Sequence, residues 1–448
     1  MQMVERLAYW SVLLQMPIYI AQKDVAGGLH WSHIEKGIIY FWWALVQNLT
    51  PLFSGYLADK FGRKIILRLS FIIIILGFIF MSVSKDFLPF FLATLTLGFG
   101  LGSFKPIIQG SIAGELNNEI SSFGWGLYVM LVNLSVFLAP PISILLKSYN
   151  WSLLFWGSAI LFSLNFIFIS FYKENKNLKF NNIHLGVFFK NLFSSELIKF
   201  LLFMSGFTIV YMQFYETLPN YIYDWVDTSS VAKWLHLPGS MLMTTPTGKM
   251  IAFEWLYNLN TGLIVLFVTP IAIIFHKFRI TRAISFGVLI ASIGLGFCGF
   301  FYVGSIVMLG FVIYTFGEMI ANPKFTEYLG ILAPKNLEST FLSYLNISWA
   351  IGLAGGGLLG GYLYNVFGEK ATLAKRYLFE VLHYTQKIDL NQSMNKIQQI
   401  TGNSQLEITK ELFNKYSPEL IWLPFILLGV LSAISLFLLK NKPKESIK

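Results

Sequence analysis

The sequence has little charge, little histidine and almost no cysteine. Only 12% of its 448 residues are charged, whereas a soluble domain has roughly 25%. The single cysteine, Cys298, excludes an intrachain disulfide and any multi-cysteine metal site. None of the six histidines lies in the middle of an apolar run or has the spacing of metal ligands. With no nucleophile–base pair and no phosphate-binding loop, the sequence predicts neither an enzyme nor a bound cofactor.

What the chain has in excess is apolar sequence, since 55% of it is hydrophobic. Apolar runs of about 20 residues recur, and each can cross about 30 Å of hydrocarbon as a helix. Lipid offers the backbone no hydrogen-bond partner, so these runs should be helical. The sequence therefore predicts an all-α integral membrane protein with twelve transmembrane helices in two six-helix bundles. The predicted spans are 4–22, 34–57, 65–83, 87–112, 123–146, 151–172, 200–222, 255–275, 283–302, 306–332, 341–366 and 418–439.

Polar segments divide the chain. The predicted units are an N-terminal bundle (1–172), a cytoplasmic linker (173–199), a C-terminal bundle (200–440) with extracytoplasmic insertions at 224–254 and 369–417, and a basic tail (441–448). The first insertion contains Pro238 and Gly239, which predicts a loop with little regular structure. In the second, Leu373, Tyr377 and Leu378 recur at roughly helical spacing, which predicts an amphipathic surface helix.

The formal net charge of +10 comes mostly from Lys and Arg in the linker, the tail and short turns between spans. This is the positive-inside pattern, and it places both termini in the cytoplasm. The pattern favours a membrane protein, in a bacterial-type inner membrane, over a protein that binds nucleic acid. Polar residues interrupt the first run, so we expect no cleavable signal peptide. The expected partners are a small solute, protons and the lipid bilayer, with the chain acting as a monomer.

One turn has a recognisable motif. The stretch after the second span reads Gly55-Tyr-Leu-Ala-Asp59-Lys-Phe-Gly62-Arg63-Lys64. Gly62 permits a tight turn, and Asp59 can cap a helix end or pair with a basic residue. The turn resembles the loop signature of the major facilitator superfamily, whose six-plus-six layout the spans also match. The resemblance implies that fold, and it places Asp59 and Arg63 in gating.

Four further stretches resemble the proton-dependent oligopeptide transporter (POT/PTR) family. They are Glu5-Arg6-Leu-Ala-Tyr9-Trp10, Gly102-Ser-Phe-Lys105-Pro106, Asn133-Leu-Ser-Val-Phe-Leu-Ala-Pro140 and Gly317-Glu318-Met-Ile-Ala-Asn-Pro323. The Gly-Pro motif of drug/proton antiporters is absent from the fifth span. The resemblance implies a proton-coupled symporter that imports di- or tripeptides by alternating access. The alternative is a transporter or exporter of a non-peptide small molecule, because Gln2 replaces a family glutamate and the family's outer-gate arginine has no match.

The residues themselves indicate a charge cluster. Gln2, Glu5 and Tyr9 lie on one face of a helix, and Lys105 falls at a depth where it could meet Glu5. Charges inside a membrane span are costly, so they usually face a cavity and a partner. A substrate carboxylate that binds Arg6 or Lys105 would favour protonation of Glu5, which couples solute to proton. The alternative is a static pair between packed helices.

The other candidates each have two interpretations. The resemblance assigns Glu318 to a substrate amine, but Glu318 could instead pair with a neighbour such as Lys324. Asn133 either lines the cavity or hydrogen-bonds between helices. The asparagine expected at the start of the eighth span is Asn258 or Asn260. Glu216 is either part of an extracellular gate, with Lys36 as partner, or a solvated helix end. The predicted substrate-binding set is Tyr9, Asn133, Asn258 and Glu318.

Overall fold

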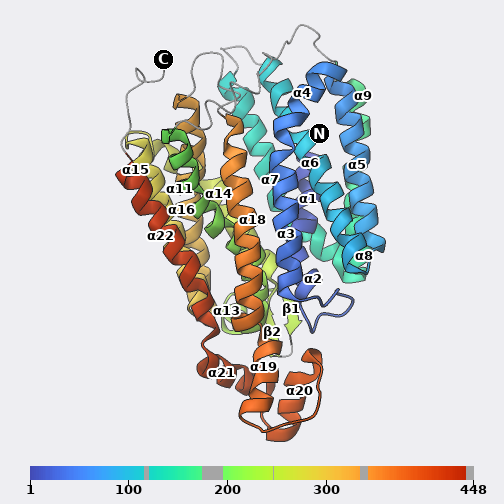
Figure 1. Cartoon of the computed structure of the whole chain (residues 1–448), viewed down its shortest axis with the longest axis vertical. Helices are drawn as coiled ribbons and strands as arrows, with labels where there is room; N and C mark the ends of the chain where they lie inside the picture. Colours follow the sequence, from blue (N-terminus) through green and yellow to red (C-terminus); the bar gives the residue numbers. More distant parts are fainter. Residues whose placement is uncertain (116–120, 174–194, 246, 333–341, 440–448) are drawn as a thin grey trace.

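The protein is a bundle of membrane-length helices in two halves (Figure 1). Its structure is a computed structural model that describes residues 1–115, 121–173, 195–245, 247–332 and 342–439. In Figure 1 the N-terminal half is blue to cyan and the C-terminal half is green to red. Ten helices in this part of the chain are long and apolar enough to cross a membrane. The first two predicted spans, each divided into two shorter helices, are not among these ten, and with them the twelve-helix prediction is confirmed.

The N-terminal half contains nine described helices. They are α1 (Gln2–Leu13), α2 (Met16–Ala21), α3 (His33–Leu49), α4 (Pro51–Phe61), α5 (Arg63–Val83), α6 (Phe87–Glu115), α7 (Ser121–Tyr149), α8 (Trp151–Ser163) and α9 (Asn165–Phe171).

The C-terminal half contains the remaining elements. Its membrane-spanning helices and their short extensions are α11 (Ser195–Glu216), α12 (Leu218–Trp225), α14 (Phe253–Phe275), α15 (Ile280–Gly299), α16 (Gly304–Leu332), α18 (Leu345–Leu363), the π-helical turn η2 (Tyr364–Gly368), η3 (Pro418–Trp422) and α22 (Leu423–Leu438). Between them lie α13 (Ser229–Trp234), η1 (Gly239–Met241), β1 (Leu242–Thr245), β2 (Gly248–Ile251), α19 (Lys370–Glu380), α20 (Leu390–Thr401) and α21 (Gln405–Tyr416).

Four spans that the sequence predicts as continuous are divided. In three of them the second helix has a proline in its first turn: Pro17 in α2, Pro51 in α4 and Pro219 in α12. The sixth span is divided into α8 and α9 without a proline. Proline has no N–H to donate and fits only the first turn of a helix, so a new helix starts there. In contrast, α16 continues through Pro323, so the helix that carries Glu318 is not divided there.

The two insertions are more ordered than the sequence indicates. The first contains α13 and an antiparallel hairpin, in which Leu242 pairs with Ile251 and Thr245 with Gly248; the prediction of a loop is therefore wrong. Gly248, at φ 137°, supplies backbone freedom at the turn. The second insertion forms α19, α20 and α21 rather than a single helix. Gly402, at φ 75°, ends α20, and a new cap begins α21.

Both insertions lie at the same end of the bundle (Figure 1), which we call the insertion end. The two halves meet where α3 packs against α18 and α7 against α14. Gly37 permits the first of these contacts, because a Cβ there would lie 2.6 Å from the carbonyl oxygen of Gly357. Gly357 of α18 therefore lies in close contact with α3.

Candidate solute site and inter-half seal

The predicted charge cluster assembles around Glu5 on α1. Its Oε2 accepts a hydrogen bond from Gln2 Nε2 at 2.6 Å and lies 3.2 Å from Arg6 Nε. Glu5 is only 3% exposed. Lys105 comes from α6 and interacts electrostatically with both Glu5 and Arg6. Because its side chain is exposed as well, Lys105 faces a space shared with α1 rather than a packed core.

Tyr9 forms the aromatic wall behind this cluster. The Arg6 guanidinium lies 5.8 Å from the centre of the Tyr9 ring, a distance at which a cation and a ring attract. Gln47 on α3 lies 3.5 Å from the Tyr9 hydroxyl, and Trp43 packs edge-on at 6.0 Å. Gln47 and Trp43 thus contact Tyr9, and the Tyr9 ring in turn lies beside the Arg6 guanidinium.

A second cluster lies in the C-terminal half around Glu318 on α16. Glu318 is 6% exposed. Its Oε2 accepts a hydrogen bond from Asn260 Nδ2 at 3.2 Å, and its Oε1 lies 3.4 Å from Asn322 Nδ2. Asn260 also donates to Thr315 Oγ1 at 2.9 Å and accepts from the Tyr215 hydroxyl at 3.3 Å. No cation among the described residues forms an ion pair with this carboxylate.

The structure separates several alternatives. Lys324 pairs with Glu327 at 2.7 Å rather than with Glu318. Asn260 contacts Glu318, whereas Asn258 is buried with no hydrogen-bond partner in the described part of the chain. Residues two apart on a helix point about 200° away from each other, so which asparagine faces Glu318 depends on the rotation of α14, which the sequence does not give. Asn133 is half-buried on α7.

Aromatic side chains connect the two clusters across the halves. The rings of Trp10 on α1 and Tyr215 on α11 have centres 5.2 Å apart. Tyr211, 4.7 Å from Tyr215, interacts electrostatically with both Arg6 and Glu318. The cationic cluster and the lone carboxylate therefore face the same central region.

An ion pair closes the insertion end directly below the surface. Lys36 Nζ lies 2.8 Å from Glu216 Oε1, and neither side chain is exposed. The same ammonium donates to Asn220 Oδ1 at 2.9 Å and to the carbonyl of Glu216 at 3.0 Å. This is the pairing that the sequence suggested, and it excludes the solvated helix end. The role of Glu216 in gating remains a proposal.

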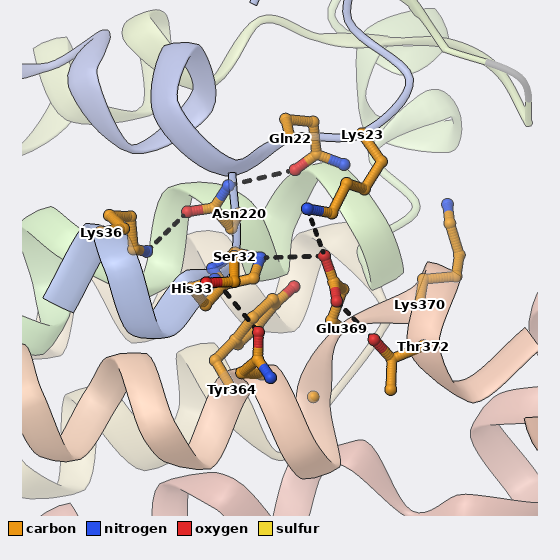
Figure 2. A network of polar contacts seen from close by, with 12 residues as sticks. Gln22, Lys23, Ser32, His33, Lys36, Asn220, Tyr364, Glu369, Lys370 and Thr372 are labelled. Atoms are coloured by element: carbon orange, nitrogen blue, oxygen red, sulfur yellow. Dashed lines mark hydrogen bonds and ion pairs between the residues drawn. The ribbon is translucent and has the colours of Figure 1, made fainter. Parts of the chain in front are cut away.

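Sequence reasoning missed two further contacts between the halves. Lys147 on α7 lies 2.6 Å from Glu254 on α14. Glu369, after η2, lies 3.7 Å from Lys23 and 3.6 Å from His33 in the N-terminal half (Figure 2). These residues lie singly at the ends of apolar runs, on the same side of the membrane. That placement is the feature of the sequence that could have revealed them. We call these contacts, together with Lys36–Glu216, the inter-half seal.

The seal has a consistent polarity. In each of its lysine–glutamate pairs the N-terminal half supplies the cation and the C-terminal half supplies the carboxylate. Such complementary charges attract the halves to each other at this end.

The signature turn after the second span is at the opposite end. Arg63 is buried at the start of α5, directly after Gly62, which has φ 94° and ends α4. The side chain of Asp59 lies outside the described residues. Gating by Asp59 and Arg63 therefore remains a prediction.

The chain matches the family model of the Major Facilitator Superfamily over residues 1–357. The chain belongs to this superfamily. Among curated proteins, it is 20% identical to the multidrug resistance protein MdtH of Yersinia enterocolitica over 342 residues, 75% of this chain and 79% of that protein. The MdtH of Salmonella paratyphi B is 21% identical over 340 residues, with the same shares of each chain covered.

Solved transporters share the fold. A POT family transporter in complex with 5-aminolevulinic acid has a TM-score of 0.64 and 18% identity, covering 93% of this chain and 95% of that chain. A POT family transporter with a thioalcohol-conjugated peptide has a TM-score of 0.65 and 18% identity, covering 93% and 94%. A variant of the nucleoside transporter NupG has a TM-score of 0.68 and 12% identity, covering 98% and 99%. The chain is thus a transporter of this superfamily rather than an enzyme.

Proposed function

We propose that this superfamily member is a proton-coupled symporter that imports small zwitterionic solutes, with di- and tripeptides as the first class to test. The main support is the pair of opposed clusters at the centre. Arg6 and Lys105 offer cations on one half, and Glu318 offers a carboxylate on the other. A solute with a carboxylate at one end and an amine at the other can bridge them, and bridging would draw the halves together.

Proton coupling in this proposal acts through Glu5. Arg6 Nε is 3.2 Å from its carboxylate, and the positive charge of Arg6 opposes proton binding at Glu5 as long as Arg6 stays there. A solute carboxylate that takes Arg6 and Lys105 weakens this hold and favours proton binding at Glu5. Proton and solute then travel together. Gln2, which donates to Glu5 at 2.6 Å, cannot itself take up a proton at this position.

The seal and the charge distribution suggest the orientation. The basic turn at Arg63 and Lys64 lies opposite the insertions, and basic loops favour the cytoplasm. We place both termini inside a bacterial-type inner membrane and the insertion end outside. The described conformation is then closed to the outside, with a monomer as the transporting unit.

A second candidate is transport or export of a non-peptide solute on the same fold. The MdtH relatives and the NupG neighbour support it, as does Gln2, which leaves the Glu5 cluster one carboxylate short of the POT pattern.

The test is uptake of a labelled dipeptide into proteoliposomes, with and without an inside-alkaline, inside-negative gradient. Wild type should accumulate the peptide only with the gradient. Glu5→Gln and Lys105→Ala should abolish accumulation, whereas Glu327→Gln, whose carboxylate only pairs with Lys324, should behave as wild type. If wild type accumulates no peptide but still binds nucleosides or drugs, the second candidate replaces the first.

A further inference from the structure

Glu369 lies where three parts of the chain meet. It follows η2 at the end of the span formed by α18, and it is the N-cap residue of α19, from which the helical insertion continues. Its side chain points towards Lys23 and His33 of the other half (Figure 2). The residue is only 3% exposed. Any change in its charge therefore acts on the C-terminal half, the insertion and the seal together.

The Glu369 carboxylate is held more loosely than that of Glu216, whose Oε1 lies 2.8 Å from Lys36 Nζ. Its Oε1 lies 3.7 Å from Lys23 Nζ and 3.6 Å from His33 Nε2, both longer than a hydrogen bond. Its Oε2 accepts from the Thr372 hydroxyl. Oε1 thus has the Lys23 ammonium and the His33 imidazole as neighbours but no hydrogen-bond donor in the described part of the chain. A carboxylate oxygen that accepts no hydrogen bond can bind a proton without losing one.

A cavity of about 130 Å³ leads to this carboxylate. It is lined by Asp24 and His33 from the N-terminal half, Asp224 from the C-terminal half and Asn391 from α20. Asp24 and Asn391 are exposed, whereas His33 and Asp224 are buried. Water at the insertion end can therefore reach Glu369 without passing the Lys36–Glu216 pair.

The other charged groups near Glu369 do not compete for this role. Asp224 is already bonded to the Tyr364 hydroxyl at 2.7 Å and to Gln22 Nε2 at 2.7 Å. Lys370, the next residue, donates from its Nζ to the carbonyl of Asp224 at 3.0 Å. The remaining groups that face Glu369 are Lys23, His33 and the hydroxyl of Thr372, with Lys36 acting at longer range.

We propose that Glu369 is a further proton-accepting residue of the transport cycle, loaded from the insertion end, and that its protonation releases the insertion and the C-terminal half from Lys23 and His33. The inference rests on the proposed proton coupling. The proton comes from water in the cavity and binds Oε1. The neutral carboxyl no longer balances the Lys23 ammonium, so the contact between the halves at this point weakens. Glu369 would supply a protonatable carboxyl that the Glu5 cluster lacks at Gln2.

The test measures the seal directly, without solute or gradient. Spin labels are placed at Ala26→Cys and Gln392→Cys, both exposed positions on opposite sides of this contact, in a Cys298→Ser background in nanodiscs. Pulsed EPR then gives the distance between the insertion and the N-terminal half at pH 5 to 8. Wild type should show one short distance at pH 8 and a growing longer population as the pH falls.

Glu369→Gln mimics the protonated carboxyl. It should show the longer distance already at pH 8 and no pH dependence. Glu380→Gln is the matched control, because Glu380 lies on the same α19 and its pair with Arg376 is exposed; it should titrate as wild type does. If Glu369→Gln does not fold, Lys23→Gln removes the partner instead and should also widen the distance at pH 8.

A pH-dependent distance in Glu369→Gln, or an unchanged short distance at pH 8 in both Glu369→Gln and Lys23→Gln, would overturn the inference. These outcomes do not depend on transport. If the EPR result is as expected but no solute accumulates, only the proposed function fails. If transport is proton-driven and the EPR distance in wild type ignores pH, only the role of Glu369 fails.

Discussion

Removing the Lys36 ammonium should open the inter-half seal. In Lys36→Met the chain keeps its shape at this site but leaves Glu216, which is not exposed at all, without a counter-charge. Glu216 retains one hydrogen bond, from the Thr217 hydroxyl to Oε2 at 2.8 Å. Breaking a buried pair by removing one partner costs about 3–5 kcal/mol.

The size of the effect on the seal follows from this cost. A loss of about 3–5 kcal/mol corresponds to a fall in the ratio of sealed to open molecules of roughly 100- to 4,000-fold.

The assay is pulsed EPR with labels at Ala26→Cys and Lys233→Cys, exposed positions on the two halves at the insertion end. Adding Glu216→Gln to Lys36→Met should restore much of the sealed population, because no buried charge remains. Arg376→Met is the comparison, because its pair with Glu380 is about half exposed and lies within α19, so its loss should leave the seal intact. The reasoning is wrong if Lys36→Met opens the seal no more than Arg376→Met does.

Three other outcomes follow from the structure. Glu5→Gln should leave dipeptide binding measurable but remove the dependence of dipeptide flux on the proton gradient. Binding and flux assays on the same preparation would show this. Gly37→Val should lower the melting temperature, because its Cβ would lie 2.6 Å from the carbonyl oxygen of Gly357; Gly55→Val, where the space is open, is the control. Ser404 N–H and hydroxyl groups lower the pKa of Glu407, so the stability that this cap gives α21 is present at neutral pH and lost as the pH falls. Ser404→Ala should cost about 1 kcal/mol and remove that pH dependence, which hydrogen exchange of α21 at pH 3 and pH 7 would reveal.

The sequence predicts the fold because lipid leaves few options for a long apolar run. It fails where the backbone leaves the regular helix: Pro17, Pro51 and Pro219 restart helices inside three spans. The hairpin in the first insertion escaped notice because strands of four residues are too short for a reliable alternation pattern. Length and hydropathy thus predict how many spans form. They do not predict where a span divides into two helices, which the three-dimensional structure shows.

The site was predictable in part for a related reason. Lone charges in or beside apolar runs, such as Glu5, Lys105 and Glu216, are conspicuous, since burying them without a partner is costly. Their partners are not conspicuous. Lys147 and Glu254 are 107 positions apart, and only the packing of α7 against α14 brings them together. Sequence therefore indicates which residues need a partner and leaves the choice of partner to the fold.

The polarity of the seal has a consequence for how protons can act on it. Every carboxylate of the seal belongs to the C-terminal half, so a proton that binds Glu369 lowers the negative charge of that half and leaves the cations of the other half unchanged. Access to water differs among the contacts. Glu369 borders the cavity, whereas Lys36 and Glu216 have no exposure. A falling external pH should therefore act first on the contact of Glu369 with Lys23, while the Lys36–Glu216 pair stays closed to water.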